Sequence, residues 1–103
     1  MSRLALWVML KAKPGREAEA EVFLKQGAEM ARTEPSTSTW YGVKIAQGVY
    51  AVFGTFHDEE GREAHLNGDI AKALMTRAPE LFSNVLQVEK MDILSTKDAH
   101  IIH

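Results

Sequence analysis

The four histidines of this chain are the side chains that exchange protons most readily near neutral pH, so they are the first candidates for acid–base chemistry. His65 lies in the segment Glu63-Ala64-His65-Leu66, just before a predicted break between two helices. In one interpretation, His65 faces a pocket and takes a proton from a substrate as a general base. In the other, His65 is half-exposed and pairs with Asp69 on the surface of a continuous helix. Periodicity alone favours the second interpretation.

The other histidines give weaker signals. His57 closes a predicted strand and is a candidate for a second polar group at the mouth of a pocket, although a histidine at a strand end is usually just exposed. His100 and His103 have the spacing of a pair of metal ligands. Because no third ligand is predicted near this terminal segment, we expect no metal site.

The sequence also lacks the motifs that indicate a bound cofactor or a nucleophilic catalytic residue. It has no cysteine, which excludes disulfides, thiolate zinc sites and thiol nucleophiles. Its seven glycines are scattered at turns and do not form a phosphate-binding loop. No nucleophile elbow with a Ser-His-Asp order is present. We therefore expect no flavin, nicotinamide or other cofactor.

Aromatic side chains are concentrated in the predicted strands: Trp7, Trp40, Tyr41, Tyr50, Phe53 and Phe56. In a functional interpretation, some of them line an apolar cavity and stack on a planar aromatic substrate. Most of them must pack in the core and in a dimer interface, because a sheet of this size has little else to fill its core.

Length and composition limit the class of protein. A chain of 103 residues, 46% hydrophobic and 25% charged, is sufficient for one globular domain over 1–103. With 12 basic and 14 acidic residues, the net charge of −2 gives no electrostatic reason to expect nucleic acid or a membrane as partner. No apolar run approaches the roughly 20 residues of a membrane span, and no signal-peptide pattern follows Met1. We expect a cytoplasmic protein.

Hydrophobic periodicity and turn residues predict the elements that must position these side chains. We expect strands over 4–11, 37–45, 49–57 and 85–94, and helices over 16–32, 59–67 and 69–78. A hairpin turn is expected at 46–48, an N-cap at Asp58, and a helix break at Asn67-Gly68. Pro79 is expected to end the last helix, and 95–103 reads as a tail.

This order is the split β-α-β-β-α-β arrangement of the ferredoxin-like α+β folds, an antiparallel sheet with helices on one face. Such a sheet needs only one apolar face. The segments 4–11 and 49–57 are apolar on both faces, so something must cover the second face. A second copy of the chain is the simplest cover, and we expect a homodimer.

Two segments resemble the antibiotic biosynthesis monooxygenase (ABM) family of dimeric α+β barrel proteins. They are Lys13 to Glu17, after the first predicted strand, and Tyr50 to Leu74, which contains the EAHL sequence around His65. The resemblance covers nearly the whole chain. It implies one pocket per subunit, between the sheet and the helices.

Family members often include cofactor-independent oxygenases that act on quinols and polycyclic phenols. The resemblance implies that His65 is the catalytic base and that Asn67 or His57 orients oxygen atoms. The pocket would be lined by apolar and aromatic side chains from the strands and the last helix: Trp40, Tyr50, Phe53, Phe56, Ile70 and Leu74. The expected ligand is a small apolar or aromatic molecule.

Two departures from the quinol-oxidising relatives keep other functions open. Those relatives carry a second histidine where this chain has Ile70, and an acidic residue where it has Gly54. One alternative is a non-catalytic dimeric module that binds a small ligand or acts in a stress response. Another is an isomerase or decarboxylase in which the same histidine moves a proton without oxygen.

Overall fold

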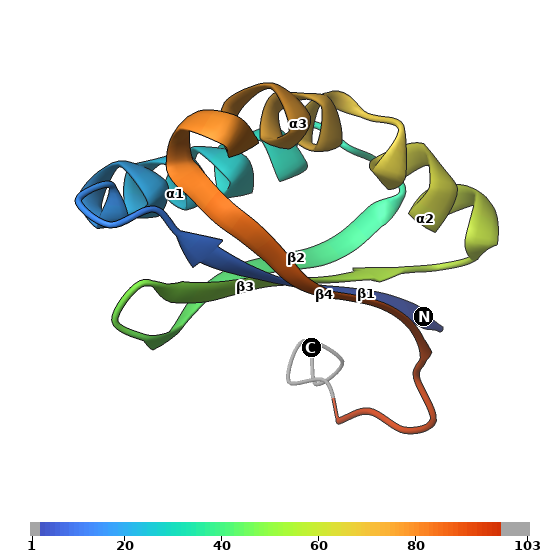
Figure 1. Ribbon diagram of the computed structural model, residues 1–103. Coiled ribbons are helices and arrows are strands. Elements are labelled where there is room, and N and C mark those ends of the chain that lie inside the picture. Colours follow the sequence, from blue (N-terminus) through green and yellow to red (C-terminus); the bar gives the residue numbers. More distant parts are fainter. Residues whose placement is uncertain (1–2, 98–103) are drawn as a thin grey trace.

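The computed structural model describes residues 3–97, which form one antiparallel sheet with helices packed on it (Figure 1). The elements follow one another as β1 (Leu4–Ala12), α1 (Glu17–Ala31), β2 (Thr37–Ala46), β3 (Val49–Phe56), α2 (Glu59–Leu66), α3 (Asp69–Leu81) and β4 (Phe82–Asp92). The four strands lie in the order β2-β3-β1-β4. All three helices lie on the same side of the sheet, so the predicted α+β ferredoxin-like fold is confirmed.

Alternation along the central strand β1 separates its side chains between the two faces. Leu6, Val8 and Leu10 point toward the helices and are almost completely buried. Their partners in the register of β3 are Gly54, Val52 and Tyr50, which therefore share the helix-covered face. The hydrophobic core lies between this face and the helices.

The opposite face of the sheet is also apolar, as the sequence predicts. Tyr41 of β2 and Phe53 of β3 are register partners, and their rings stack with centroids 6.5 Å apart. Trp7 of β1 is the other register partner of Phe53. Phe53 was expected to line the helix-side pocket, and this expectation is wrong because the pleat places its side chain on the other face.

Local signals fix several element boundaries where the sequence predicts them. Asp58 caps α2, since its Oδ1 accepts a hydrogen bond of 2.9 Å from the backbone N–H of Gly61. The hairpin between β2 and β3 turns at Gly48, whose φ of 78° lies in the left-handed region that glycine adopts without strain. The helical region breaks between Leu66 and Asp69, as expected.

Pro79 does not end α3, contrary to the prediction. The helix continues through it to Leu81, and β4 follows directly at Phe82 instead of after a turn. A proline inside a helix leaves the carbonyl four residues earlier without its donor. That carbonyl belongs to Met75, a residue that is 78% exposed, so the lost hydrogen bond lies on the solvent side of α3. Within residues 3–97, no helix has the length and apolar character of a membrane span.

Candidate functional site

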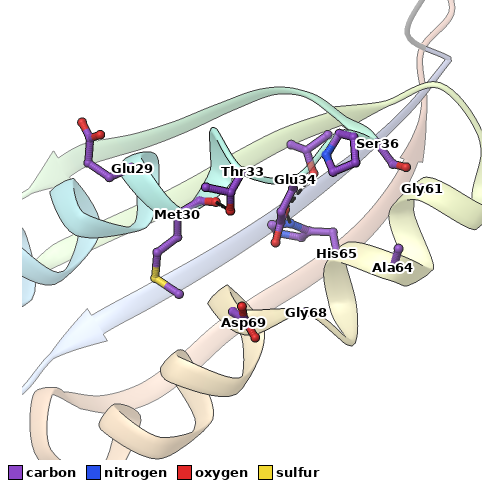
Figure 2. A pocket seen from close by; sticks show the side chains of 12 residues that line it. Glu29, Met30, Thr33, Glu34, Ser36, Gly61, Ala64, His65, Gly68 and Asp69 are labelled. Carbon is purple, nitrogen blue, oxygen red and sulfur yellow. Dashed lines mark hydrogen bonds and ion pairs between the residues drawn. The ribbon is translucent and has the colours of Figure 1, made fainter.

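His65 is a buried side chain at the end of α2, with 7% of its surface exposed. Its Nδ1 lies 2.6 Å from Oε1 of Glu34, and its ring packs against the ring of Phe56 with centroids 5.2 Å apart. Figure 2 shows the imidazole directed from α2 toward Glu34. The half-exposed interpretation is therefore wrong. Asp69 is not its partner, because α2 ends at Leu66 and the helical spacing between residues 65 and 69 is lost.

Glu34 is the functional candidate that sequence reasoning missed. It lies in the turn after α1, where the sequence indicated only the end of a helix. Its Oε1 also accepts a hydrogen bond of 2.8 Å from Oγ1 of Thr37, and 19% of its side chain is exposed. A hydrogen bond between residues 31 positions apart has no local sequence signal, so only the fold brings His65 and Glu34 together.

Two glycines allow the close approach that this pair requires. A Cβ on Gly61 of α2 would lie 3.0 Å from the carbonyl oxygen of Ser36, and a Cβ on Gly68 would lie 3.0 Å from Oε2 of Glu34. Side chains at these positions would separate α2 from the turn after α1. Gly68 is also the N-cap of α3, so the Glu34 carboxylate lies near a helix N-terminus, where the helix dipole favours negative charge.

His65 lies between two hollows of different character. On one side is an apolar cavity of about 70 Å³ between the sheet and the helices, which Trp40, Ile70 and Leu74 also line. On the other side is an open cleft of about 580 Å³, lined in part by Glu34 and Asp69. The imidazole therefore lies between an apolar interior cavity and an open cleft.

Comparison with solved structures identifies the fold of this chain. It is similar to NE2512 of Nitrosomonas europaea, a protein of unknown function, with 44% sequence identity and a TM-score of 0.91 over 94% of each chain. The chain belongs to the same family as NE2512. Candidate antibiotic biosynthesis monooxygenases from Caulobacter crescentus and Chloroflexus aurantiacus also superimpose on it.

For the Caulobacter protein the identity is 23% and the TM-score 0.74, over 91% of this chain and 92% of that one. For the Chloroflexus protein they are 13% and 0.76, over 94% and 98%. The chain has the ABM fold. No protein-family model matches its sequence, and no curated protein does.

Within this ABM fold, the structure brings together only part of the expected site. Trp40, Ile70 and Leu74 line the cavity beside His65. Phe56 is fully buried and touches the His65 ring from the sheet without lining the cavity.

Tyr50 is also buried on the helix-covered face, but it belongs to a separate pair. Its hydroxyl donates a hydrogen bond of 2.7 Å to Oε2 of Glu21 on α1. Burial, and then the Glu21 carboxylate, raises the pKa of Tyr50 to about 12, so the phenol stays neutral at physiological pH. The same hydrogen bond lowers the pKa of Glu21.

The two polar residues expected to assist His65 lie outside both hollows. His57 is exposed, next to the end of β3. Asn67 is exposed as well, and its Nδ2 donates a hydrogen bond of 2.9 Å to the carbonyl of Glu63, which closes the last turn of α2. Among residues 3–97, no three His, Cys, Asp or Glu side chains form a group that could hold a metal ion. His100 and His103 lie outside the described residues.

Proposed function

We propose that this protein is a cofactor-independent monooxygenase of a small aromatic, quinol-like substrate, with His65 as the general base. One observation supports the proposal most directly: a buried imidazole lines an apolar cavity while a carboxylate holds its other edge. The ABM fold of the chain, which it shares with candidate monooxygenases, is consistent with this activity.

The pairing with Glu34 defines what each nitrogen of His65 does. A carboxylate accepts hydrogen bonds, so the proton of the neutral imidazole is on Nδ1, which lies 2.6 Å from Oε1 of Glu34. Nε2 then carries the lone pair and is the basic atom. When Nε2 takes a proton, the negative charge of Glu34 stabilises the imidazolium that forms.

The proposed reaction needs no external reductant. His65 removes the proton of a phenolic hydroxyl, and the phenolate is electron-rich enough to reduce dioxygen itself. One ring carbon, which bears a hydrogen atom, forms a covalent bond with one oxygen atom of dioxygen. The product of this step is a hydroperoxide. Loss of water from the hydroperoxide breaks the O–O bond and leaves a quinone, so the substrate loses two hydrogens and gains one oxygen. The apolar cavity favours this sequence because it excludes water.

We also propose that the protein functions as a homodimer through the outer face of its sheet. Tyr41 and Val43 on this face are 55% and 38% exposed, which is unfavourable for large apolar side chains in water. A second copy packed on the same face would bury them in a symmetric interface. Sedimentation equilibrium tests this: a mass of one chain at micromolar concentration would contradict it.

A second candidate function is a module that binds a small apolar ligand without catalysis. It is favoured by the lining of the cavity, in which His65 is the single titratable side chain and the other residues are apolar or aromatic. Such a module would bind aromatic molecules with no consumption of oxygen.

Oxygen uptake by the metal-stripped protein distinguishes the two functions. The panel consists of hydroquinones, naphthols and anthrones, and the variants are His65→Gln and, as a control for surface charge, Glu63→Gln. We expect uptake in the native protein and a loss of about 10²-fold or more in His65→Gln, the usual contribution of a general base. Uptake that survives in His65→Gln would eliminate His65 as the base. Loss of uptake in Asn67→Ala or His57→Gln would extend the site to those residues.

A further inference from the structure

The cavity beside His65 is too small for the substrate that the proposed function requires. Its volume is about 70 Å³. A cavity known to hold a single benzene molecule has a volume of roughly 150 Å³, about twice as large. An aromatic ring can therefore reach His65 only if one wall of the cavity moves, and the identity of that wall decides which rings can enter.

Trp40 on β2 is one of the walls between this cavity and the surface, and it borders two surface grooves at once. Its indole lines the cavity and also two surface grooves between α1 and β2. One groove, of about 270 Å³, is lined by Lys44 and Tyr50 among others. The other, of about 370 Å³, is lined by Thr37 and Thr39 among others. Displacement of the indole would join the cavity to one of these grooves.

The indole lies against two glycines, which explains why it can occupy this position. A Cβ on Gly27 of α1 would lie 2.8 Å from Cη2 of Trp40, and a Cβ on Gly42 of β2 would lie 3.6 Å from its Cζ3. The absence of a side chain on Gly27 lets the six-membered ring of the indole lie close to the helix backbone. An alanine at residue 27 would collide with the indole of Trp40. The indole could relieve this clash by moving into one of the two neighbouring grooves.

The indole of Trp40 is held more weakly than the imidazole of His65, which forms another wall of the cavity. Within residues 3–97, no group accepts a hydrogen bond from its ring N–H. β2 is an edge strand, bonded only to β3 on one side. By contrast, entry from the open cleft would have to displace His65 and break its 2.6 Å contact with Glu34. Movement of Trp40 costs packing alone, and it leaves the catalytic pair intact.

We infer that Trp40 is the movable wall of the cavity and sets the size of the aromatic ring that reaches His65. This inference rests on the proposed function for the reaction that follows entry, but the entry itself is a matter of binding. The native protein accepts a single ring by partial displacement of the indole, and it disfavours fused rings.

The test is a size series of ligands measured without turnover. Isothermal titration calorimetry under argon, with phenol and 1-naphthol as probes, gives the affinity of the native protein and of the variants Trp40→Ala and Gly27→Ala. Gly27→Ala is the sharper of the two, because it keeps the indole and only pushes it outward, while alanine favours the helix. Gln26→Ala on the same helix is the matched control, since this position does not line the cavity.

We expect 1-naphthol to bind at least tenfold more tightly to Trp40→Ala and several-fold more tightly to Gly27→Ala than to the native protein. Phenol should change by less than about threefold, and Gln26→Ala should match the native protein. In a Trp7→Phe background, the emission of Trp40 should shift to the red in Gly27→Ala as the ring meets water. Equal or weaker binding of 1-naphthol in both variants would overturn the inference.

Binding under argon separates this inference from the proposed function. If binding depends on ligand size and responds to Trp40, but no oxygen is consumed in air, the proposed monooxygenase activity is rejected and the inference about the movable wall is supported. If oxygen uptake with naphthols is identical in the native protein, Trp40→Ala and Gly27→Ala, the inference about the movable wall is rejected and the proposed monooxygenase activity is supported.

Discussion

Two buried rings between the sheet and the helices are each hydrogen-bonded to a glutamate, and they differ in which of their polar atoms remain free. His65 contacts Glu34 at 2.6 Å and Tyr50 contacts Glu21 at 2.7 Å. An imidazole has two nitrogens, so the pairing of Nδ1 with Glu34 still leaves Nε2 for a substrate. A phenol has one oxygen, and in Tyr50 that oxygen is already used.

The two glutamates differ as well. Glu21 is also paired with a cation, since Nζ of Lys44 lies 3.3 Å from its Oε2. Glu34 has no lysine or arginine partner within the described residues and accepts from the neutral hydroxyl of Thr37. Its charge is therefore available to stabilise an imidazolium, whereas the charge of Glu21 is already balanced. The candidate site differs from the structural pair because, among residues 3–97, His65 keeps a nitrogen without a hydrogen-bond partner and Glu34 keeps an unbalanced charge. The hydrogen-bond lengths of the two pairs are nearly the same.

We expect removal of the Glu34 charge to have the largest effect on activity of any change to the two pairs. In Glu34→Gln the side chain keeps its shape and can still accept from Nδ1 of His65, but it no longer stabilises a protonated ring. We expect kcat for oxygen uptake to fall by about 10- to 100-fold with little change in KM.

The matched control for Glu34→Gln is Glu63→Gln, which removes the same charge from an exposed residue on α2 that pairs with Lys90. Long-range nitrogen–proton NMR correlations report whether His65 keeps its proton on Nδ1. An unchanged kcat in Glu34→Gln would show that the carboxylate only supports the fold, and the comparison between the two pairs would then fail.

The local features of the fold could be predicted from the sequence, and the candidate site only in part. The cap at Asp58 and the turn at Gly48 depend on a few neighbouring residues, so their sequence signals are complete. The pairing of His65 with Glu34 depends on how α2 packs against the turn after α1, which no local pattern encodes. Phe53 illustrates a third case, because β-alternation was visible but both faces are apolar. Pro79 does not end α3, since the hydrogen bond that it removes would be accepted by Met75, an exposed residue on the solvent side of the helix.

We expect a smaller effect at Tyr50, in the pair with Glu21, and this effect is on stability at high pH. Its pKa is raised from 10.0 to about 12, first by burial and then by the hydrogen bond with Glu21. The folded protein therefore holds the phenolic proton more tightly than the unfolded chain does. The stability contributed by the neutral phenol is present below pH 10 and is lost as the pH rises from about 10 to about 12.

Allowing for solvent screening at the partly exposed Glu21, we expect this loss to be about 1–2 kcal/mol in the free energy of unfolding. Urea denaturation between pH 9 and 12 measures it, and Tyr50→Phe isolates it from the titration of lysines, because both proteins contain the same lysines. The difference between native protein and Tyr50→Phe should narrow with rising pH as the native protein alone is destabilised. A difference that stays constant would mean that Tyr50 ionises freely in the folded state, and its hydroxyl would then be open to solvent, unlike the closed pair described above.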